Sequence, residues 1–226
     1  MPFQNNIEKT VLNKCPLCLS SSKYFAEGEN RRYFLCSCCS MIFVPAEFFL
    51  PRNEEINRYL EHENNMENAG YVAMFESVIS DIKSCCGEIN LILDYGCGYE
   101  PVLKKILEKY DYTADIYDVF FFPEMRLRKN YDLIISTETF EHFKYPNKEL
   151  DRIVSLISPS GYLAIMTQLY SFKNETTLKE IFNDWYYKRD PTHIAFYSVK
   201  TFDWIARRYQ LKIVFNNKKN FLILQK

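Results

Sequence analysis

The chain has 226 residues, of which 47% are hydrophobic, 25% charged and 16% aromatic. This composition is typical of a globular protein and counts against disorder, while the length suits one ordinary domain with a small additional module. The net charge of −1 gives no general electrostatic attraction to nucleic acid or to anionic membranes. No apolar run approaches the roughly 20 residues that span a bilayer, and the first residues lack a signal-peptide core, so we expect a cytoplasmic location and no membrane partner.

Near the N-terminus, cysteines follow the spacing of a zinc ribbon. In the reducing cytoplasm such cysteines favour metal binding over disulfides, and two C-x2-C turns make a closed tetrahedral site for structural zinc. Between the two turns, Tyr24-Phe25 and Tyr33-Phe34-Leu35 predict a short hairpin. Cys38 leaves the fourth ligand open, and a chance cluster of buried thiols is the alternative. The expected zinc ligands, within a module over residues 1–45, are Cys15, Cys18, Cys36 and Cys39.

Residues 46–70 are polar and charged, and they predict a linker with a short helix, in which His62 could form part of a lid. Apolar residues at 75, 78, 79 and 82 follow the period of an amphipathic helix, and the apolar run 89–94 predicts a buried parallel strand. Strands over 112–118, 131–137 and 162–167 then alternate with helical stripes over 103–110 and 150–157. A helix capped by Ser198 precedes a closing hairpin of 211–215 and 221–224. Residues 71–226 are therefore expected to form a doubly wound, Rossmann-like α/β sheet ending in an antiparallel hairpin.

The segment after the first strand of this domain has the features of a nucleotide-binding loop. Gly96 and Gly98 follow Asp94 and lead into a helix. Glycine lets the backbone approach a ligand closely, and the amides at a helix N-terminus can hold a carboxylate. Asp118 lies about 20 residues beyond, at the end of the second strand, where an acid accepts hydrogen bonds from ribose hydroxyls.

Together these motifs resemble class I S-adenosylmethionine-dependent methyltransferases over residues 70–226. Asp94-x-Gly96-x-Gly98 is similar to their first motif, and Asp118 to their ribose-binding acid. The segment 136–143 resembles the one after the fourth strand of the subgroup that includes ubiquinone-biosynthesis O-methyltransferases; 159–163 resembles the turn into their fifth strand, and 189–198 also has counterparts. A dinucleotide dehydrogenase shares the glycine loop and the acid, but the closing hairpin and the Glu141-His142 segment belong to the methyltransferase pattern. The resemblance implies S-adenosylmethionine as cofactor, with contacts from Asp94, Gly96, Cys97, Gly98, Asp118, Val119, Thr137 and Glu138.

The sequence departs from that pattern in two places. Glu100-Pro101 replaces the third glycine, and Glu100 could crowd the methionine end of the cofactor or bind its ammonium group. Only residues 119–130 separate the second strand from the next clear one, so the usual third strand and its adenine-contacting loop are expected to be short or absent. The three phenylalanines at 120–122 could pack on the adenine or in the core.

Methyl transfer depends mainly on positioning, and a base is needed only where the accepting atom loses a proton. His142 and His193 are the candidates for this base, and either could instead hold its loop in place. Residues 185–187 (Trp-Tyr-Tyr) could wall the acceptor pocket or pack on the sheet edge.

The expected function is methyl transfer to a small molecule, such as a sugar nucleotide or a secondary metabolite. One alternative is an RNA methyltransferase that grips RNA with the ribbon, against which the near-neutral charge counts. The other is a non-catalytic scaffold with a degenerate cofactor site, supported by Glu100 and the short adenine region. The oligomeric state is not indicated.

Overall fold

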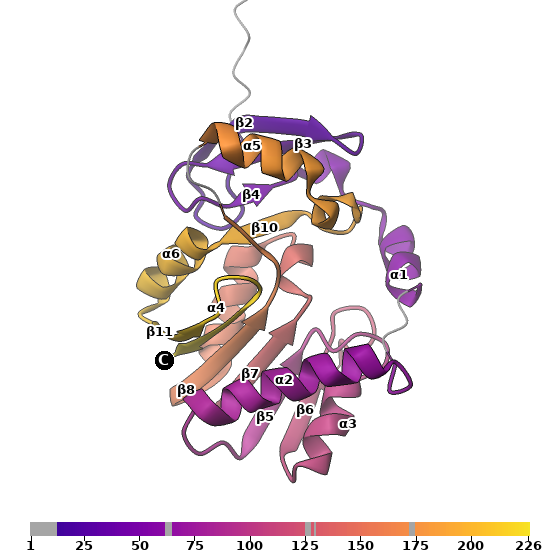
Figure 1. The fold of residues 1–226 in the computed structure, drawn as a ribbon, viewed down its shortest axis with the longest axis vertical. Coiled ribbons are helices and arrows are strands. Elements are labelled where there is room, and N and C mark those ends of the chain that lie inside the picture. Colours follow the sequence, from indigo (N-terminus) through magenta and orange to yellow (C-terminus); the bar gives the residue numbers. More distant parts are fainter. Residues whose placement is uncertain (1–12, 62–64, 125–127, 129, 172–174) are drawn as a thin grey trace, which may run out of the picture.

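A computed structural model describes residues 13–61, 65–124, 128, 130–171 and 175–226. Two sheets are stacked along the long axis of the molecule (Figure 1). In the lower sheet the strand order is β6-β5-β7-β8-β12-β11. Its strands are β5 (Leu91–Tyr95), β6 (Thr113–Tyr117), β7 (Tyr131–Thr137), β8 (Ile157–Met166), β11 (Lys212–Asn216) and β12 (Phe221–Gln225).

The four strands β6, β5, β7 and β8 run parallel, whereas β12 pairs antiparallel with β8 and with β11. This arrangement confirms the predicted α/β fold with its closing antiparallel hairpin. Among the described residues between β6 and β7 (118–124, 128 and 130) none joins the sheet, and Asp118 and Phe122 form only an isolated bridge. As expected from the short spacing, β6 is therefore an edge strand.

Alternate residues of the central strands point to opposite faces of this sheet, and helices cover both. Ile92 and Leu133 pack against α2 (Ala69–Cys85) and α3 (Val102–Lys109). Leu93 and Ile134 pack on the other face, against α4 (Pro146–Leu156) and α6 (Val199–Tyr209). Ser198 caps α6 as predicted, because its hydroxyl accepts a hydrogen bond from the Thr201 amide at 3.2 Å.

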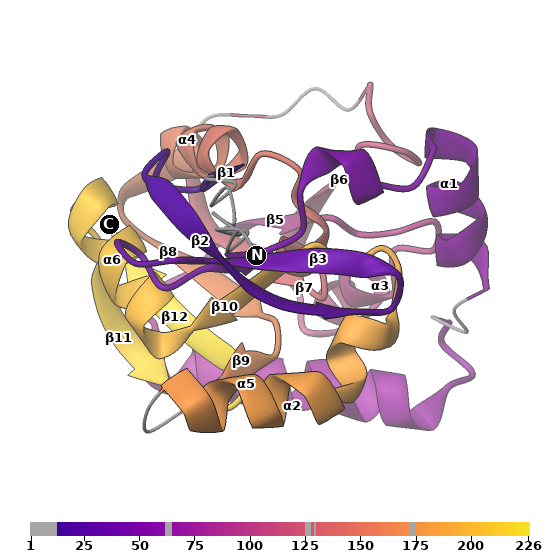
Figure 2. The same cartoon turned by 90° about the horizontal axis from the view of Figure 1, so that it is seen from above.

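The upper sheet combines the N-terminal hairpin with strands from the second half of the chain, as Figure 2 shows from above. Its strand order is β1 (Asn13–Lys14), β2 (Ser21–Gly28), β3 (Arg31–Cys36), β4 (Ile42–Phe43), β10 (Ala195–Ser198) and β9 (Leu169–Tyr170). β4 pairs with β10 across the expected module boundaries, and α5 (Glu175–Asp184) packs on the outer face of the hairpin. The cysteine-containing segment therefore forms one sheet with β9 and β10, which follow β8 in the chain.

Between the two sheets, the chain passes through η1 (Ala46–Phe48) and α1 (Arg52–Leu60), the short helix expected in the linker. α1 lies at one side of the molecule, where it spans from the upper to the lower sheet (Figure 1). His62 lies outside the described residues. None of the helices in the described parts of the chain has the length and apolar character needed to cross a membrane.

Candidate active site at the carboxyl ends of the strands

A cavity of about 790 Å³ lies where β5, β6 and β7 end. This is the topological position at which doubly wound sheets bind ligands, and the volume is within the range of small-molecule sites. The loops after these strands form one half of the wall. The other half comes from α1, from η2 (Phe140–His142) and the start of α4, and from η3 (Tyr186–Arg189) with the residues that follow it.

The glycine loop after β5 requires glycine for two different reasons. At Gly96 φ is +88°, and an added Cβ would lie 2.3 Å from the Thr139 side chain, so the position is sterically closed. Gly98 has φ of +68°, and an added Cβ would meet no atom within 4 Å. Gly98 also lines the cavity, so its backbone borders open space that a ligand can occupy.

Asp118 fixes this loop to the end of β6. Its Oδ2 accepts a hydrogen bond from the Gly98 amide at 3.1 Å. Its Oδ1 accepts hydrogen bonds from the amides of Phe120 at 2.8 Å and Phe121 at 3.1 Å. Each carboxylate oxygen can accept about two hydrogen bonds. Among the described residues only the Gly98 amide donates to Oδ2, which leaves one acceptor position for a ligand hydroxyl.

The structure places the other predicted cofactor residues around this loop. Asp94 is buried and is not among the residues that line the cavity, and burial, together with the nearby Asp118, raises its pKa to about 8. The remaining four residues all line the cavity: Cys97, Val119, Thr137 and Glu138.

Glu100 and the three phenylalanines at 120–122 differ in whether they reach the cavity. The Glu100 carboxylate pairs with Lys105 Nζ at 2.8 Å, and Glu100 is not among the cavity-lining residues. It therefore does not crowd the cavity. Phe120 and Phe121 line the wall, whereas Phe122 does not.

His142 and His193, predicted as candidate bases, lie side by side in the second half of the cavity. Their ring centroids are 4.9 Å apart. His142 Nδ1 lies 3.0 Å from the Thr192 carbonyl oxygen, and His193 Nδ1 lies 2.6 Å from that of Tyr187. A carbonyl can only accept, so each Nδ1 carries a hydrogen, and in the neutral form of either ring Nε2 is the acceptor. Burial, with His142 as a second cause, lowers the pKa of His193 to about 4.

Behind the histidines lies a buried acid that the sequence analysis did not select as a site residue. Glu141 is fully buried, and its carboxylate accepts hydrogen bonds from Tyr187 OH at 2.5 Å and Thr167 Oγ1 at 2.9 Å. Burial and the neighbouring Glu141 raise the pKa of Glu138. Tyr186 and Tyr187 line the cavity, whereas Trp185 packs against Phe182 and Phe196.

Helix α1 closes the cavity on one side through two ion pairs. Arg58 Nη2 lies 2.9 Å from Asp190 Oδ2, and Lys144 Nζ lies 2.6 Å from Glu55 Oε2. The pKa of Asp190 is well below its usual range: burial alone would raise it, but hydrogen bonds from Thr192 and Arg58 outweigh this. These pairs tie the linker helix to both the histidine loop and the start of α4.

The four predicted cysteines converge at the base of the N-terminal hairpin. The Sγ–Sγ distances are 3.5 Å between Cys15 and Cys39 and 3.3 Å between Cys18 and Cys36, and all four sulfurs lie within 4.8 Å of one another. Four thiolates about 2.3 Å from one zinc ion would lie about 3.8 Å apart, so the arrangement is compatible with zinc. Cys38 is exposed and outside this cluster, which favours Cys39 as the fourth member.

A parallel sheet that closes with an antiparallel hairpin, together with a glycine loop and an acid at the switch point, defines a Rossmann-like ligand-binding protein. The profile of a family described as "Methyltransferase domain" matches residues 50–215. The chain therefore belongs to this family of methyltransferases.

The chain is similar to several solved structures. The PH0226 protein of Pyrococcus horikoshii superposes with a TM-score of 0.53 at 12% identity, covering 75% of this chain and 98% of that one. YcgJ of Bacillus subtilis gives 0.45 at 16% identity, covering 61% and 69% of the two chains. An S-adenosylmethionine-dependent methyltransferase from Mesorhizobium loti gives 0.43 at 9% identity, covering 72% and 100%. A search of curated proteins finds no match.

Proposed function

We propose that this cavity binds S-adenosylmethionine along the glycine loop and transfers its methyl group to a small-molecule acceptor held against the histidine pair. The observation that carries the proposal is the open space beside Gly98, next to the free acceptor position of Asp118 Oδ2. The cofactor would supply an electrophilic methyl group. Asp118 would hold the ribose hydroxyls, and the Phe120 and Phe121 rings would pack on the adenine.

On the acceptor side, His193 and His142 are the groups that we propose to orient or deprotonate the accepting atom. Both rings line the cavity, and both present Nε2 as an acceptor because Nδ1 is engaged with a carbonyl. The low pKa of His193 keeps its imidazole neutral near pH 7, which is the form that can take up a proton.

The acceptor side of the cavity offers a cationic side chain for an anionic acceptor. The acids Glu55 and Asp190 are neutralised there by Lys144 and Arg58. Arg52 and Arg189 also line the cavity, and among the described residues neither forms an ion pair. Arg52 instead lies over the Phe120 ring, with Cζ 4.7 Å from the centroid. We propose that Arg189, which adjoins Asp190 on the acceptor side, receives a phosphate or carboxylate of the acceptor.

For the cysteine cluster we propose a structural zinc ion. Four ligands from two C-x2-C turns leave no open coordination position, so the ion would stabilise the hairpin and take no part in methyl transfer.

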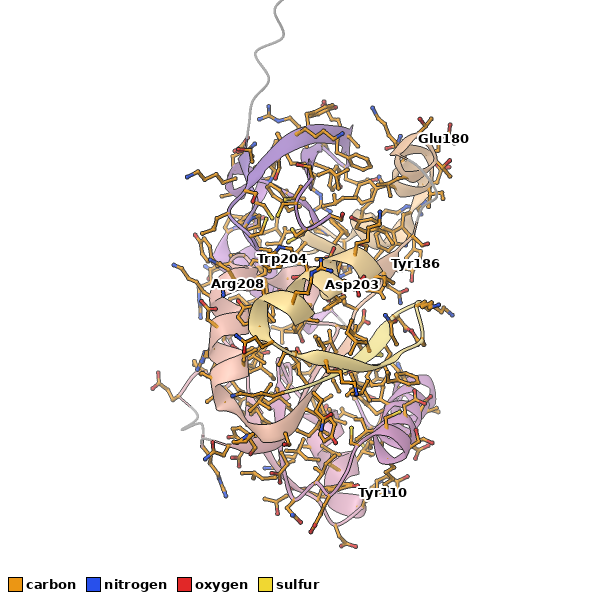
Figure 3. All side chains as sticks on the ribbon, turned by 90° about the vertical axis from the view of Figure 1, so that its left-hand side faces the viewer. Tyr110, Glu180, Tyr186, Asp203, Trp204 and Arg208 are labelled. Carbon is orange, nitrogen blue, oxygen red and sulfur yellow. The ribbon has the colours of Figure 1, made fainter. Side chains whose placement is uncertain are left out.

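The test is calorimetric titration of the zinc-loaded protein with S-adenosylhomocysteine. Val119 is 52% exposed in the cavity wall, so Val119→Trp should fill the cofactor half and abolish binding without disturbing the core. Tyr110→Trp is the control, because Tyr110 is exposed at the far end of α3 (Figure 3). A folded wild-type chain that binds no S-adenosylhomocysteine would overturn the proposal and leave a non-catalytic scaffold as the better interpretation. Salt-dependent binding of RNA would instead favour an RNA acceptor.

A further inference from the structure

The tip of the N-terminal hairpin docks on the loop that carries the histidine site. β2 and β3 are joined by Glu29 and Asn30, whose φ angles are 53° and 56°, so both residues adopt the left-handed conformation of a type I′ turn. This turn directs the Glu29 carboxylate to Lys188 Nζ at 2.6 Å, and Lys188 is only 4% exposed. A glutamate in this conformation is unfavourable by itself, and the ion pair offsets that cost.

Arg31, the first residue of β3, makes the central contact. It is 4% exposed, and its guanidinium donates to three main-chain carbonyls of one short segment. Nη2 donates to the carbonyls of Lys188 and Asp190, the latter at 2.7 Å, and Nη1 donates to that of Pro191 at 2.9 Å. Nε donates to Tyr33 OH at 3.0 Å and thereby fixes the guanidinium on the hairpin.

The carbonyls that orient the two histidines lie on either side of those that Arg31 binds. His193 Nδ1 is held by the Tyr187 carbonyl, just before Lys188, and His142 Nδ1 by the Thr192 carbonyl, just after Pro191. A displacement of this segment would therefore move together the two carbonyls to which the imidazoles are hydrogen-bonded. The segment 187–192 includes only part of η3 and has no strand of its own, so its position depends on contacts with neighbouring elements.

From this geometry we infer that Arg31 is a positioning residue, through which the cysteine-bearing hairpin fixes segment 187–193 and hence the orientation of His142 and His193. The role of these histidines in catalysis rests on the proposed function. The positioning of segment 187–193 by Arg31 does not depend on it. A guanidinium suits this task because its planar array of donors reaches several carbonyls at once, which a lysine ammonium cannot do in the same geometry.

The neighbouring Arg32 provides a matched control. It lies in the same strand, but its side chain is 40% exposed, pairs with Glu47 at 2.6 Å and lies over the Phe48 ring. We would compare Arg31→Met, Arg31→Lys and Arg32→Met by amide hydrogen exchange and by proton NMR of the histidine Cε1–H signals. The chain has three histidines, so His→Gln variants assign these signals.

In Arg31→Met we expect exchange of residues 187–193 to rise roughly tenfold or more, because several charge-assisted hydrogen bonds are lost. The signals of His142 and His193 should shift, while exchange in β5 and β7 stays unchanged. Arg31→Lys should fall between Arg31→Met and the wild type, and Arg32→Met should match the wild type. Affinity for S-adenosylhomocysteine should stay within about twofold in all three, since Arg31 does not line the cavity.

Wild-type exchange and unshifted histidine signals in folded Arg31→Met would overturn the inference, as would equal effects of Arg31→Met and Arg32→Met. If Arg31→Met does not fold, Arg31→Lys decides: raised exchange confined to 187–193 supports the link, and unchanged exchange overturns it. Failure of the wild-type chain to bind S-adenosylhomocysteine would count against the proposed function alone, because the exchange and NMR measurements need no cofactor.

Discussion

The rings of His142 and His193 lie edge to face with their centroids 4.9 Å apart, although η2 supplies one and the loop before β10 the other. Both rings direct Nδ1 to a main-chain carbonyl, so in the neutral form of either ring Nε2 is the proton acceptor. In the proposed function the pair would therefore serve as a single site for handling a proton of the acceptor.

Replacing either histidine should reduce turnover without affecting cofactor binding. For His193→Gln and His142→Gln we expect kcat to fall by roughly 100-fold at the residue that serves as the base. Neither residue belongs to the glycine loop, so S-adenosylhomocysteine affinity should be unchanged. The measurement is transfer of labelled methyl groups to an acceptor found by screening anionic small molecules. Unchanged turnover in both variants would remove the histidines from the mechanism.

The pH dependence should reveal which histidine is used. Burial lowers the pKa of His193 to about 4, so this imidazole is already neutral at pH 6. If His193 is the base, kcat/KM should rise with pH through about 4 and then stay flat from about pH 5.5 to pH 8. A rise centred near pH 6.5, the ordinary histidine value, would instead identify a base other than His193.

Asp94 should make the protein less stable as pH rises. Burial raises its pKa to about 8, against about 3.9 in an unfolded chain. Between these values the folded state holds a proton that the unfolded state releases, so the Asp94 contribution to the free energy of unfolding falls with increasing pH. For one titrating group, the free energy of unfolding changes by at most about 1.4 kcal/mol per pH unit.

Urea unfolding of wild type and Asp94→Asn from about pH 5 to about pH 8 measures this effect. The stability of wild type relative to the variant should decline over that range. Asp184→Asn, at an exposed position at the end of α5, is the control. Its free energy of unfolding, plotted against pH, should run parallel to that of wild type. Parallel curves for Asp94→Asn as well would contradict the assignment.

Features set by short sequence spacings could be predicted from the sequence. The strand–Asp94–glycine-loop pattern and the C-x2-C pairs are local, and the structure brings each set together as expected. The apolar runs at 89–94 and 131–137 likewise predicted two strands of the main sheet, which the structure contains as β5 and β7.

Features that depend on distant partners gave no such signal. β10 has only four residues, and it is defined by pairing with β4 from the other end of the chain. Arg31 is an ordinary charged residue in the sequence, and its importance becomes visible only when its partners, 157 to 160 positions away, are in place. For the same reason, Tyr187 and Glu141 could not be recognised as one buried network.

The adjacent cysteines 38 and 39 allow a direct test of the zinc site. We expect about one zinc ion per chain by elemental analysis. Cys39→Ser should lose the metal and lower the unfolding temperature, because Cys39 Sγ lies within the cluster. Cys38→Ser should keep the metal, since Cys38 is exposed and outside the cluster. Loss of zinc from Cys38→Ser but not from Cys39→Ser would reassign the fourth ligand.

The neighbouring tyrosines 186 and 187 distinguish a buried hydroxyl from an exposed one. Tyr187 OH donates to the fully buried carboxylate of Glu141, and burial raises the pKa of Tyr187 far above its ordinary value. Tyr187→Phe leaves that carboxylate with one donor fewer, so the free energy of unfolding should fall by about 1 to 3 kcal/mol. Tyr186 is 61% exposed and lies at the surface below α5 (Figure 3), so Tyr186→Phe should change stability by less than about 0.5 kcal/mol. Urea unfolding of the two variants decides: equal stabilities would mean that the Tyr187–Glu141 hydrogen bond does not stabilise the fold.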